Sequence, residues 1–505
     1  MFRVALCLYA ADNARAQSLD WVKQDGGQGI DNAEAIAVDS LGNSYVTGTF
    51  RIETTFGAGE SNETVLTGTG GQSIFIAKYG PNGLLVWARG AGGAPFVQDW
   101  AFGIALDSAG NSYVTGFLTG GFADFGGGVT LNSPGAFIVK HDSEGRAEWA
   151  TTLNPNAVAW AIAVDANGNS FVGGSAPPSP ALAPQVTVWK VGATGTTLWT
   201  RSATGVYSGA AYGISVDGNG NSSVTGEVQG GIATFGPGEA NETSLGNAAG
   251  GVMFVAKYDT SGNLIWARHS TEATQFGASP RGNAISTDAA GSSYLVGMGS
   301  TILGPGEPNE TAVATAFVAK YDSLGNLVWA RTVSPGFGTV SWVFAIAHDS
   351  AGPTYITGTS IQGNVFIEKY SIDGDLLWAR KLATVASTDV LSLQGSGISL
   401  DSGGNAYVAG YFSSAVTFGP GEPGEKLLTT TILFDVDVFL AKYLTDGPVR
   451  NVAPVATDQS VTTPEDTPLT IVLSATDADN DPLIYSVVDP PQHGTLMGTA
   501  PALTY

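Results

Sequence analysis

The sequence contains a single cysteine, Cys7, in 505 residues. One thiol can form no internal disulfide and cannot supply a cysteine-based metal site. Histidine is scarce as well, and the four residues present, His141, His269, His348 and His493, show no metal-binding spacing. No G-x-S-x-G motif and no Walker-type loop occurs. The common catalytic signatures are therefore absent from the sequence.

Charged residues are also few, at 13%, and the basic ones are the fewest: 21 Lys and Arg stand against 44 Asp and Glu, for a net charge of −23. Binding to a phosphate backbone needs a basic surface, so nucleic acid is not an expected partner. Solubility and divalent-cation binding are the two explanations of the negative charge. No run of eighteen apolar residues occurs, so no membrane span is expected.

The N-terminal segment, residues 1–16, has the features of a secretory signal peptide. The basic residue Arg3 precedes a short apolar run, and an A-x-A cleavage site ends at Ala16. Cleavage there would begin the mature chain at Gln17 and remove the only cysteine. We therefore expect a secreted or cell-surface protein.

Glycine, in contrast, is abundant, with 69 residues, and apolar residues make up 43% of the chain. Short alternating runs rich in Val, Ile, Thr and Tyr favour strands, and the glycines indicate many tight turns. The composition predicts an all-β protein with a core large enough to fold.

Two phrases recur seven times each, which is typical of a repeat architecture. The first, close to D-x-x-G-N-x-Y-V-T-G, begins at Asp39, Asp107, Asp165, Asp217, Asp288, Asp349 and Asp401. The second contains a lysine followed five residues later by glycine, with the lysines at Lys78, Lys140, Lys190, Lys257, Lys320, Lys369 and Lys442. A tryptophan stands nine residues after each of the first six lysines, but Asn451 stands there after the seventh.

Each phrase predicts a β-hairpin. In "AIAVDSLGNSYVTG" one alternating strand ends at Asp39 and the next begins near Ser44, and Gly42 fits the left-handed position of a type I turn. Two hairpins per repeat give four strands, and seven such units repeated radially make a seven-bladed β-propeller. The strand missing after the seventh lysine stands alone at Trp21, so we expect the N-terminal strand to complete the last blade and close the ring.

The first phrase resembles the SBBP-type bacterial β-propeller repeat over roughly residues 18–448, within the expected propeller at residues 17–448. It implies an extracellular or cell-surface bacterial protein, of a family without established chemistry. The third repeat departs most from the pattern, because the Pro-rich "SAPPSPALAP" replaces a long loop. A thin or irregular blade is expected there.

The sequence changes character at residues 451–505. The phrases "TPEDTPL", "DADNDPLIYSV" and "HGTL" resemble the cadherin-like, immunoglobulin-type β-sandwich repeats of bacterial surface proteins. Such a sandwich needs about 100 residues, so a truncated domain is expected. The resemblance implies calcium at the acidic positions, and solvated surface acid is the alternative. Those positions are Glu465, Asp466, Asp477, Asp479 and Asp481.

One position varies within the otherwise uniform repeat, five residues before each turn aspartate and near the start of the innermost strand. It carries Glu34, Phe102, Trp160, Tyr212, Asn283, Phe344 and Ser396. With Trp100 and Trp342 nearby, these residues predict a ligand-binding platform at the mouth of the channel, suited to stacking on sugars or to capturing a peptide. The alternative is that the aromatic residues plug the channel or pack between blades.

Other repeated residues are better explained as scaffold, because a site needs one constellation rather than seven. The loops related to "TFGPGEANET" contain Glu60, Glu239, Glu307 and Glu422, for which a turn motif and calcium coordination are the two interpretations. Variable loops on a rigid scaffold are the usual place for binding.

These features predict a monomeric, non-catalytic binding or adhesion protein whose variable-loop face recognises carbohydrate or protein. Two alternatives stay open. One is a polysaccharide-acting enzyme with carboxylates on the channel face, for which Glu34 is the obvious candidate. The other is a passive structural spacer within a larger surface protein.

Overall fold

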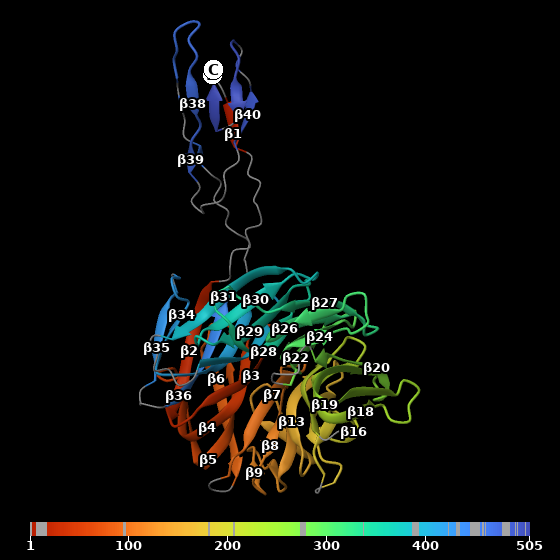
Figure 1. Cartoon of the computed structure of the whole chain (residues 1–505). Coiled ribbons are helices and arrows are strands. Elements are labelled where there is room, and N and C mark those ends of the chain that lie inside the picture. The colour runs from red at the N-terminus through yellow and green to blue at the C-terminus, as the bar shows by residue number, and fades with distance from the viewer. Residues whose placement is uncertain are drawn as a thin grey trace. The chain divides into compact units, whose positions relative to one another are not determined.

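Every element of secondary structure in the described residues is a β-strand (Figure 1). The computed structural model contains two compact units, Gln17–Thr445 and a second one formed by Met1–Ala16 with Asp446–Tyr505. It describes residues 3–6, 18–93, 97–179, 182–205, 208–272, 279–336, 338–385, 393–422, 424–430, 435–444, 455–456, 459, 461–476, 485–489, 491, 493–499 and 501–505.

The larger unit contains seven groups of four antiparallel strands, which we call blades 1 to 7. The inner strands are β3 (Asn32–Val38), β7 (Trp100–Leu106), β13 (Val158–Val164), β17 (Ser208–Val216), β22 (Arg281–Thr287), β28 (Val340–His348) and β32 (Leu393–Leu400). The second strands are β4 (Ser44–Phe56), β8 (Ser112–Leu118), β14 (Ser170–Ala176), β18 (Ser222–Phe235), β23 (Ser293–Met298), β29 (Thr354–Ser360) and β33 (Ala406–Ser413).

The outer half of each blade continues in the same order. The third strands are β5 (Thr64–Tyr79), β11 (Gly135–His141), β15 (Gln185–Val191), β19 (Thr243–Tyr258), β26 (Ala316–Tyr321), β30 (Val365–Tyr370) and β36 (Val436–Tyr443). The outer strands are β6 (Leu85–Gly93), β12 (Ala147–Asn154), β16 (Thr197–Ser202), β20 (Leu264–His269), β27 (Leu327–Thr332), β31 (Leu376–Val385) and, for blade 7, β2 (Leu19–Gln28).

The hairpin turns have the expected geometry. The Asp39 amide donates to Asn43 O at 2.9 Å, the Gly42 amide donates to Asp39 O at 3.0 Å, and Gly42 has a φ of 80°. The Asp39 carboxylate accepts the amides of Leu41 and Asn43. The prediction that Asp and Gly define the turn is confirmed, and the physical reason is that Asp caps the loop while Gly tolerates positive φ.

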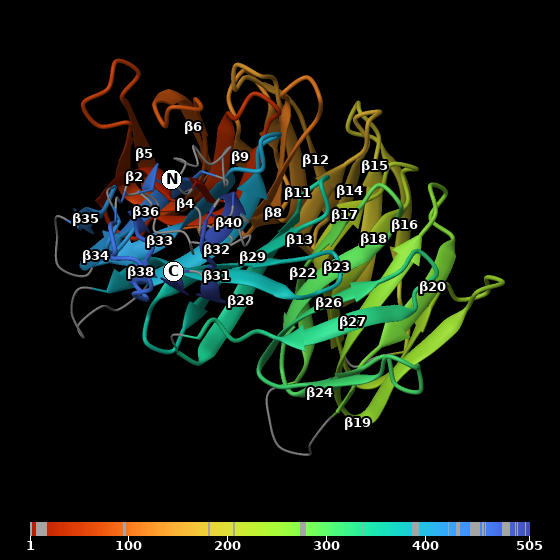
Figure 2. The ribbon, with the colours of Figure 1, turned by 90° about the horizontal axis from the view of Figure 1, so that it is seen from above.

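The blades follow one another in chain order, and the core lies between them. Each inner strand contacts the next along the series, and β32 also contacts β3. Seven clusters of buried apolar residues each join two neighbouring blades, and one of them joins Val46 of blade 1 to Leu440 of blade 7. Figure 2 shows β2 and β4, in red, beside β36 and β33, in blue.

The N-terminal strand β2 pairs antiparallel with β36, with Trp21 opposite Lys442 and Asp25 opposite Val438. It therefore occupies the place of an outer strand in blade 7. The aromatic ring of Trp21 lies against blade 1, where its Nε1 donates to Pro81 O at 3.1 Å.

Several blades extend outward through a second hairpin that pairs with the outer strand of the preceding blade or, for β24, with the short strand β21 that follows it. The outer part of β4 pairs with β2, β9 pairs with β6, β24 pairs with β21, and β34 pairs with β31. The short strands involved are β9 (Ala123–Asp124), β10 (Thr130–Leu131), β21 (Thr271–Glu272), β24 (Thr301–Leu303), β25 (Thr311–Val313), β34 (Ala415–Phe418) and β35 (Lys426–Thr429).

The expectation of a thin or irregular third blade is wrong. Strands β13 to β16 form a complete four-stranded sheet, and β14 and β15 pair without interruption over seven residues. The Pro-rich segment replaces the outward hairpin, which lies outside the blade itself, so its sequence does not disturb the four strands.

The second unit is described by itself. It contains β1 (Arg3–Leu6), β37 (Val455–Ala456), β38 (Thr470–Val472), β39 (Ala475–Thr476), β40 (Tyr485–Asp489), β41 (Met497–Thr499) and β42 (Ala502–Thr504). Strand β1 pairs with β40, β37 with β39, and β42 with both β38 and β41.

Candidate functional site

The Asp, Lys, Trp and Gly residues that recur in the blades make contacts that stabilise the fold. Lys257, for example, lies 2.8 Å from the Asp217 carboxylate, and both side chains are almost fully buried. The Trp266 Nε1 donates to Ser323 O at 3.0 Å, and its ring covers Gly325 in the turn of the next blade. Such contacts recur between blades, so these residues hold the scaffold together.

The repeated glutamates of the outward hairpins are engaged as well. Glu60, Glu239, Glu307 and Glu422 each accept the amide of the leucine that begins an outer strand, at 2.5 to 2.7 Å. Asn62, Asn241 and Asn309 donate to the carbonyl of the same leucine, at 3.1 Å. The carboxylates therefore substitute for a strand partner, which supports the turn-motif interpretation over calcium coordination.

The position that varies from repeat to repeat, five residues before each turn aspartate, coincides with an irregularity in the inner strand. In every inner strand the residue at this position is skipped in the pairing with the second strand, which makes a β-bulge. Strand β28 has a further skipped residue, Ser341. The skipped residues at the variable position are Glu34, Phe102, Trp160, Tyr212, Asn283, Phe344 and Ser396, which we call the bulge cluster. A bulge re-aims the side chain of its extra residue relative to its neighbours along the strand.

Small residues flank the bulge in six of the seven repeats. The pattern is small-X-small-Ile, as in Ala33-Glu34-Ala35-Ile36, and in blade 6 Val343 replaces the first small residue. A methyl group on Gly213 would lie 2.9 Å from Ala284 Cα of the next inner strand. The inner strands approach so closely at Gly213 that even a methyl group would be crowded there. The cluster is therefore presented by a tightly packed framework.

The structure brings the aromatic members together. The ring centroids of Phe102 and Trp160 are 4.6 Å apart, and those of Trp160 and Tyr212 are 5.7 Å apart. Phe344 stacks with Trp342 at 6.1 Å. We call these five residues the aromatic arc. Such ring separations are in the range of favourable aromatic pairs.

Arg281 connects the two parts of the arc. Its Cζ lies 5.5 Å from the centroid of Tyr212 and 4.7 Å from that of Trp342. The Tyr212 hydroxyl donates to Glu227 Oε1 at 2.9 Å, which fixes the ring. The arc thus has one cation at its centre and a carboxylate at its border.

The remaining members of the cluster are polar. Asn283 Nδ2 donates to Val343 O at 2.7 Å. Gln394 Nε2 donates to Ser396 Oγ at 3.2 Å, and Gln394 Oε1 accepts from the Tyr411 hydroxyl at 2.9 Å. Burial raises the pKa of Glu34 to about 7. Burial, and then the nearby charge of Glu34, raises the pKa of Tyr411 to about 12.

The exposure of the candidate residues varies. Trp342 is 41% exposed, while Ser396 is buried and the other bulge residues are partly buried. Trp100 is also partly buried and lies opposite Phe117 in β8. The Trp160 Nε1 is shielded from solvent without a hydrogen-bond partner among the described residues. The arc is therefore a half-open surface, whose most exposed ring is Trp342.

Sequence reasoning missed four residues of this region: Arg281, Gln394, Glu227 and Tyr411. The first two lie two residues before a bulge, where Trp100 and Trp342 stand in other repeats. The last two lie ten residues after a turn aspartate, where other repeats carry residues such as Thr49 and Ser175. Comparing these two register positions across the repeats would have identified them.

A separate set of buried carboxylates lies where β2, β3 and β36 meet. Burial raises the pKa of Asp31 to about 7, and that of Asp25 and of Asp437 to about 6. Asp25 accepts hydrogen bonds from the Tyr79 hydroxyl and the Gly57 amide, both at 2.7 Å. Asp31 Oδ2 has no hydrogen-bond partner among the described residues. No motif in the sequence indicates this group.

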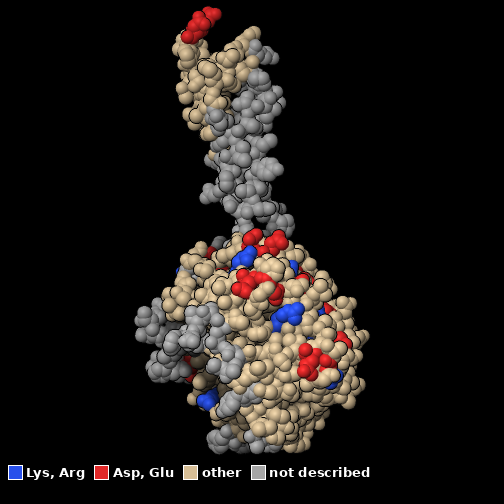
Figure 3. Space-filling model, turned by 45° about the vertical axis from the view of Figure 1, so that its right-hand side comes forward, with Lys and Arg blue, Asp and Glu red and all other residues tan. Residues whose placement is uncertain are grey.

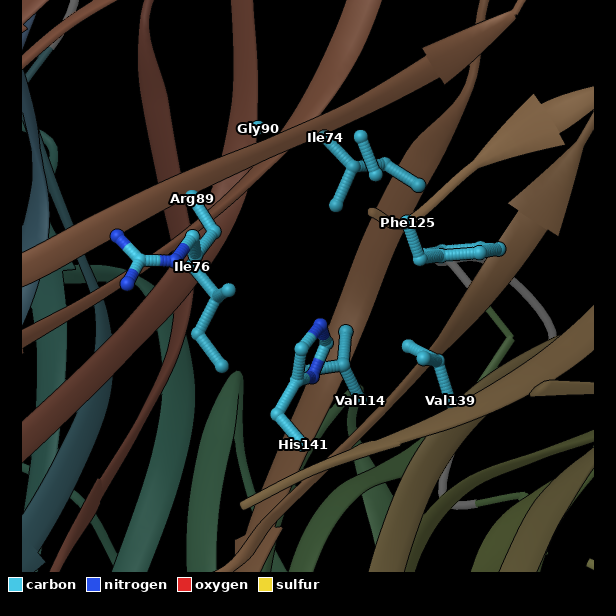
Figure 4. Close-up of a pocket in the computed structure, with 9 residues that line it drawn as sticks. Ile74, Ile76, Arg89, Gly90, Val114, Phe125, Val139 and His141 are labelled. Atoms are coloured by element: carbon cyan, nitrogen blue, oxygen red, sulfur yellow. The ribbon is translucent and has the colours of Figure 1, made fainter. Parts of the chain in front are cut away.

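Two hollows lie between blades 1 and 2. A cavity of about 10 Å³ is lined by the His141 ring and by apolar side chains such as Ile74 and Val139 (Figure 4). Burial lowers the pKa of His141 to about 4. The cavity has room for about one water molecule and none for a substrate. An open groove of about 350 Å³, lined by residues including Leu66 and Asp124, lies nearby.

Charge does not mark a site on the surface seen in Figure 3, where small separate groups of acidic and basic side chains lie among uncharged residues. No group of three His, Cys, Asp or Glu side chains suited to a metal occurs in the described part of the chain. Glu465 and Asp466 lie on an exposed turn, while Asp477, Asp479 and Asp481 lie outside the described residues. Within the described ranges, no helix long and apolar enough to span a membrane occurs.

Two families match the chain. The SBBP family, described as "Beta-propeller repeat", matches residues 20–49 and 86–116, and the family described as "Bacterial Ig domain" matches residues 451–505. The "Uncharacterized WD repeat-containing protein L264" of Acanthamoeba polyphaga mimivirus is 31% identical over 150 residues. That match spans 27% of this chain and 11% of the relative.

Solved structures with low sequence identity also match. Raptor from Chaetomium thermophilum is 8% identical over 85% of this chain and 30% of its own, with a TM-score of 0.43. The structure described as "YCF48 bound to D1 peptide" is 10% identical over 85% of this chain and 98% of its own, with a TM-score of 0.41.

Proposed function

We propose that this chain, which carries SBBP β-propeller repeats and a bacterial Ig domain, is a non-catalytic bacterial surface or secreted protein that binds carbohydrate. The bulge cluster and the aromatic arc form the binding surface. The Ig-domain match supports the surface location.

The observation that carries the proposal is the aromatic arc itself. Five rings from four inner strands lie within ring-contact distance of a neighbour or of Arg281. Aromatic faces stack on the apolar faces of sugar rings, while neighbouring amide and hydroxyl groups bind the sugar hydroxyls. Gln394, Ser396 and Tyr411 supply such groups beside the arc.

The same proposal includes the closed form of the scaffold. We propose that the seven blades make a ring completed by β2. The pairing of β2 with β36, the contact of β32 with β3 and the apolar cluster shared by blades 1 and 7 support it. A closed ring would hold the cluster rigidly, which reduces the entropic cost of binding.

A screen of the full chain against polysaccharides and glycans, in calcium and again in chelator, tests the binding function. Trp342→Ala should abolish or strongly weaken binding, because it removes the most exposed ring of the arc. Leu324→Ala is the matched control, since Leu324 is 71% exposed and lies in an Asp-Gly turn. If no glycan binds the wild-type protein, the passive spacer becomes the better explanation.

An enzyme acting on polysaccharide is the second candidate, favoured by Glu34. A carboxyl group with a pKa raised to about 7 by burial stays partly protonated at neutral pH, as a general acid requires. Glu227 is a second carboxylate in the same region. Release of reducing ends from a bound glycan, lost in Glu34→Gln, would establish this activity in place of simple binding.

Calcium stays a proposed cofactor of the C-terminal domain. The two described candidates, Glu465 and Asp466, form no three-ligand group with other described residues. The carbohydrate-binding surface proposed above therefore includes no calcium ligand. The comparison between calcium and chelator in the glycan screen tests its involvement.

A further inference from the structure

We propose that Arg281 makes the aromatic arc a site for anionic sugars, such as uronic acids. This inference rests on the proposed carbohydrate binding and specifies its ligand class.

Arg281 differs in charge from the residues at the equivalent position of the other blades. The position two residues before each bulge carries Asn32, Trp100, Val158, Ala210, Arg281, Trp342 and Gln394. Arg281 is thus the one charged residue in a set that is otherwise apolar or amide. Residues that stabilise the scaffold are repeated from blade to blade. A charge that occurs in one blade alone therefore indicates a function specific to that place.

The guanidinium is held in place by rings. It lies between Tyr212 and Trp342, with Cζ 5.5 Å and 4.7 Å from the two centroids. Stacking of this kind fixes the plane of a guanidinium while leaving its N–H groups available. The nearby Glu227 carboxylate accepts the Tyr212 hydroxyl, and no ion pair joins it to Arg281.

Other arginines of the larger unit have polar partners. Arg89, Arg201, Arg268 and Arg331 donate to backbone carbonyls, and Arg146 and Arg380 pair with glutamates. Among the described residues of this unit, Arg51 and Arg281 have no such side-chain partner. Of the two, only Arg281 lies against rings of the aromatic arc.

The expected ligand follows from this arrangement. An uncompensated guanidinium is suited to a carboxylate, which it can bind through two parallel hydrogen bonds. The flanking rings offer stacking surfaces for the sugar that carries the carboxylate. With a net charge of −23, the protein offers an anion no general attraction, so preference for an anionic sugar would have to come from this residue.

Binding of three matched tetrasaccharides to the full chain tests the inference: a galacturonate, a neutral galactose and a sulfated galactose tetrasaccharide. The galacturonate should bind tightest, and Arg281→Gln should weaken it at least about tenfold. The same substitution should leave the neutral tetrasaccharide within about twofold. Arg281→Lys should recover only part of the affinity, because lysine keeps the charge but lacks the planar fork.

The outcomes separate this inference from the proposed function. Equal binding of neutral and acidic probes, with no effect of Arg281→Gln, would overturn the anionic preference and leave carbohydrate binding intact. Tighter binding of the sulfated probe would keep the anionic class and assign it to sulfate. No binding of any probe to the wild-type protein would overturn both. An unchanged melting temperature of Arg281→Gln shows that the variant is folded.

Discussion

At the scale of single residues, the glycine of the second hairpin turn is the contact point between blades. Gly325 has a φ of 85°, and a methyl group added there would lie 2.6 Å from the Trp266 ring. Gly325→Ala should therefore lower the free energy of unfolding by about 2–5 kcal/mol, through positive φ and overpacking together. Chemical denaturation measures this. Gly218→Ala is the control, because its methyl would meet only Ala289 O, at 4.0 Å.

The buried carboxylates give a second prediction at this scale. Burial raises the pKa of Asp31 from its usual 3.8 to about 7, so between those values the native state binds more protons than the unfolded state. The contribution of Asp31 to stability should then be full below about pH 4 and be lost as pH rises to 7, by an amount on the order of a few kcal/mol. Melting temperatures across pH 4–8 test this.

Asp31→Asn removes this titration and keeps an oxygen to accept the Arg51 amide. The pH slope of its stability should therefore be smaller than that of the wild-type protein. Asp373→Asn removes the same charge from an exposed position and should leave the slope unchanged. Equal slopes in Asp31→Asn and the wild type would show that general charge repulsion, and not Asp31, causes the trend.

At the scale of the element, glutamates in the outward hairpins hold these hairpins to the outer strands of their blades through hydrogen bonds. Glu239 accepts the Leu264 amide at 2.5 Å, and its other oxygen lies 3.9 Å from Arg201 of the preceding blade. Glu239→Ala should cost about 1–3 kcal/mol, because it leaves the Leu264 amide without its acceptor. Glu239→Gln keeps an acceptor and should cost less. Thermal melts measure both, beside the exposed control Glu144→Ala, and equal losses in all three would contradict this role.

The elements also show what the sequence could and could not predict. The turns at Asp39 and its equivalents were predictable, because Asp and Gly at fixed spacing determine a local conformation. The bulge at Glu34 was not predicted, since an extra residue that occurs in every repeat leaves the spacing uniform. The small-X-small-Ile pattern around it was a readable signal. The contact of Arg281 with Tyr212 and Trp342 joins three blades, and no local pattern predicts contacts across blades.

At the scale of the whole molecule, β2 connects blade 7 with blade 1. Leu19 and Val22 are buried in the cluster shared by blades 6 and 7, and Trp21 donates to Pro81 in blade 1. Lys23 pairs with Glu60, also of blade 1. The strand therefore contributes both hydrogen bonds and apolar contacts to the junction between the last blade and the first.

Deleting residues 17–29 should lower the melting temperature substantially, because it exposes the edge of β36 and removes these contacts. A synthetic peptide spanning Leu19–Gln28, added to the deleted protein, should restore part of the loss by refilling that edge. The same peptide with Trp21→Ala should restore less, since it lacks the bond to Pro81 and the ring that covers Gly83. An unchanged melting temperature after the deletion would show that the blades hold together without β2, and the closed-ring proposal would fail.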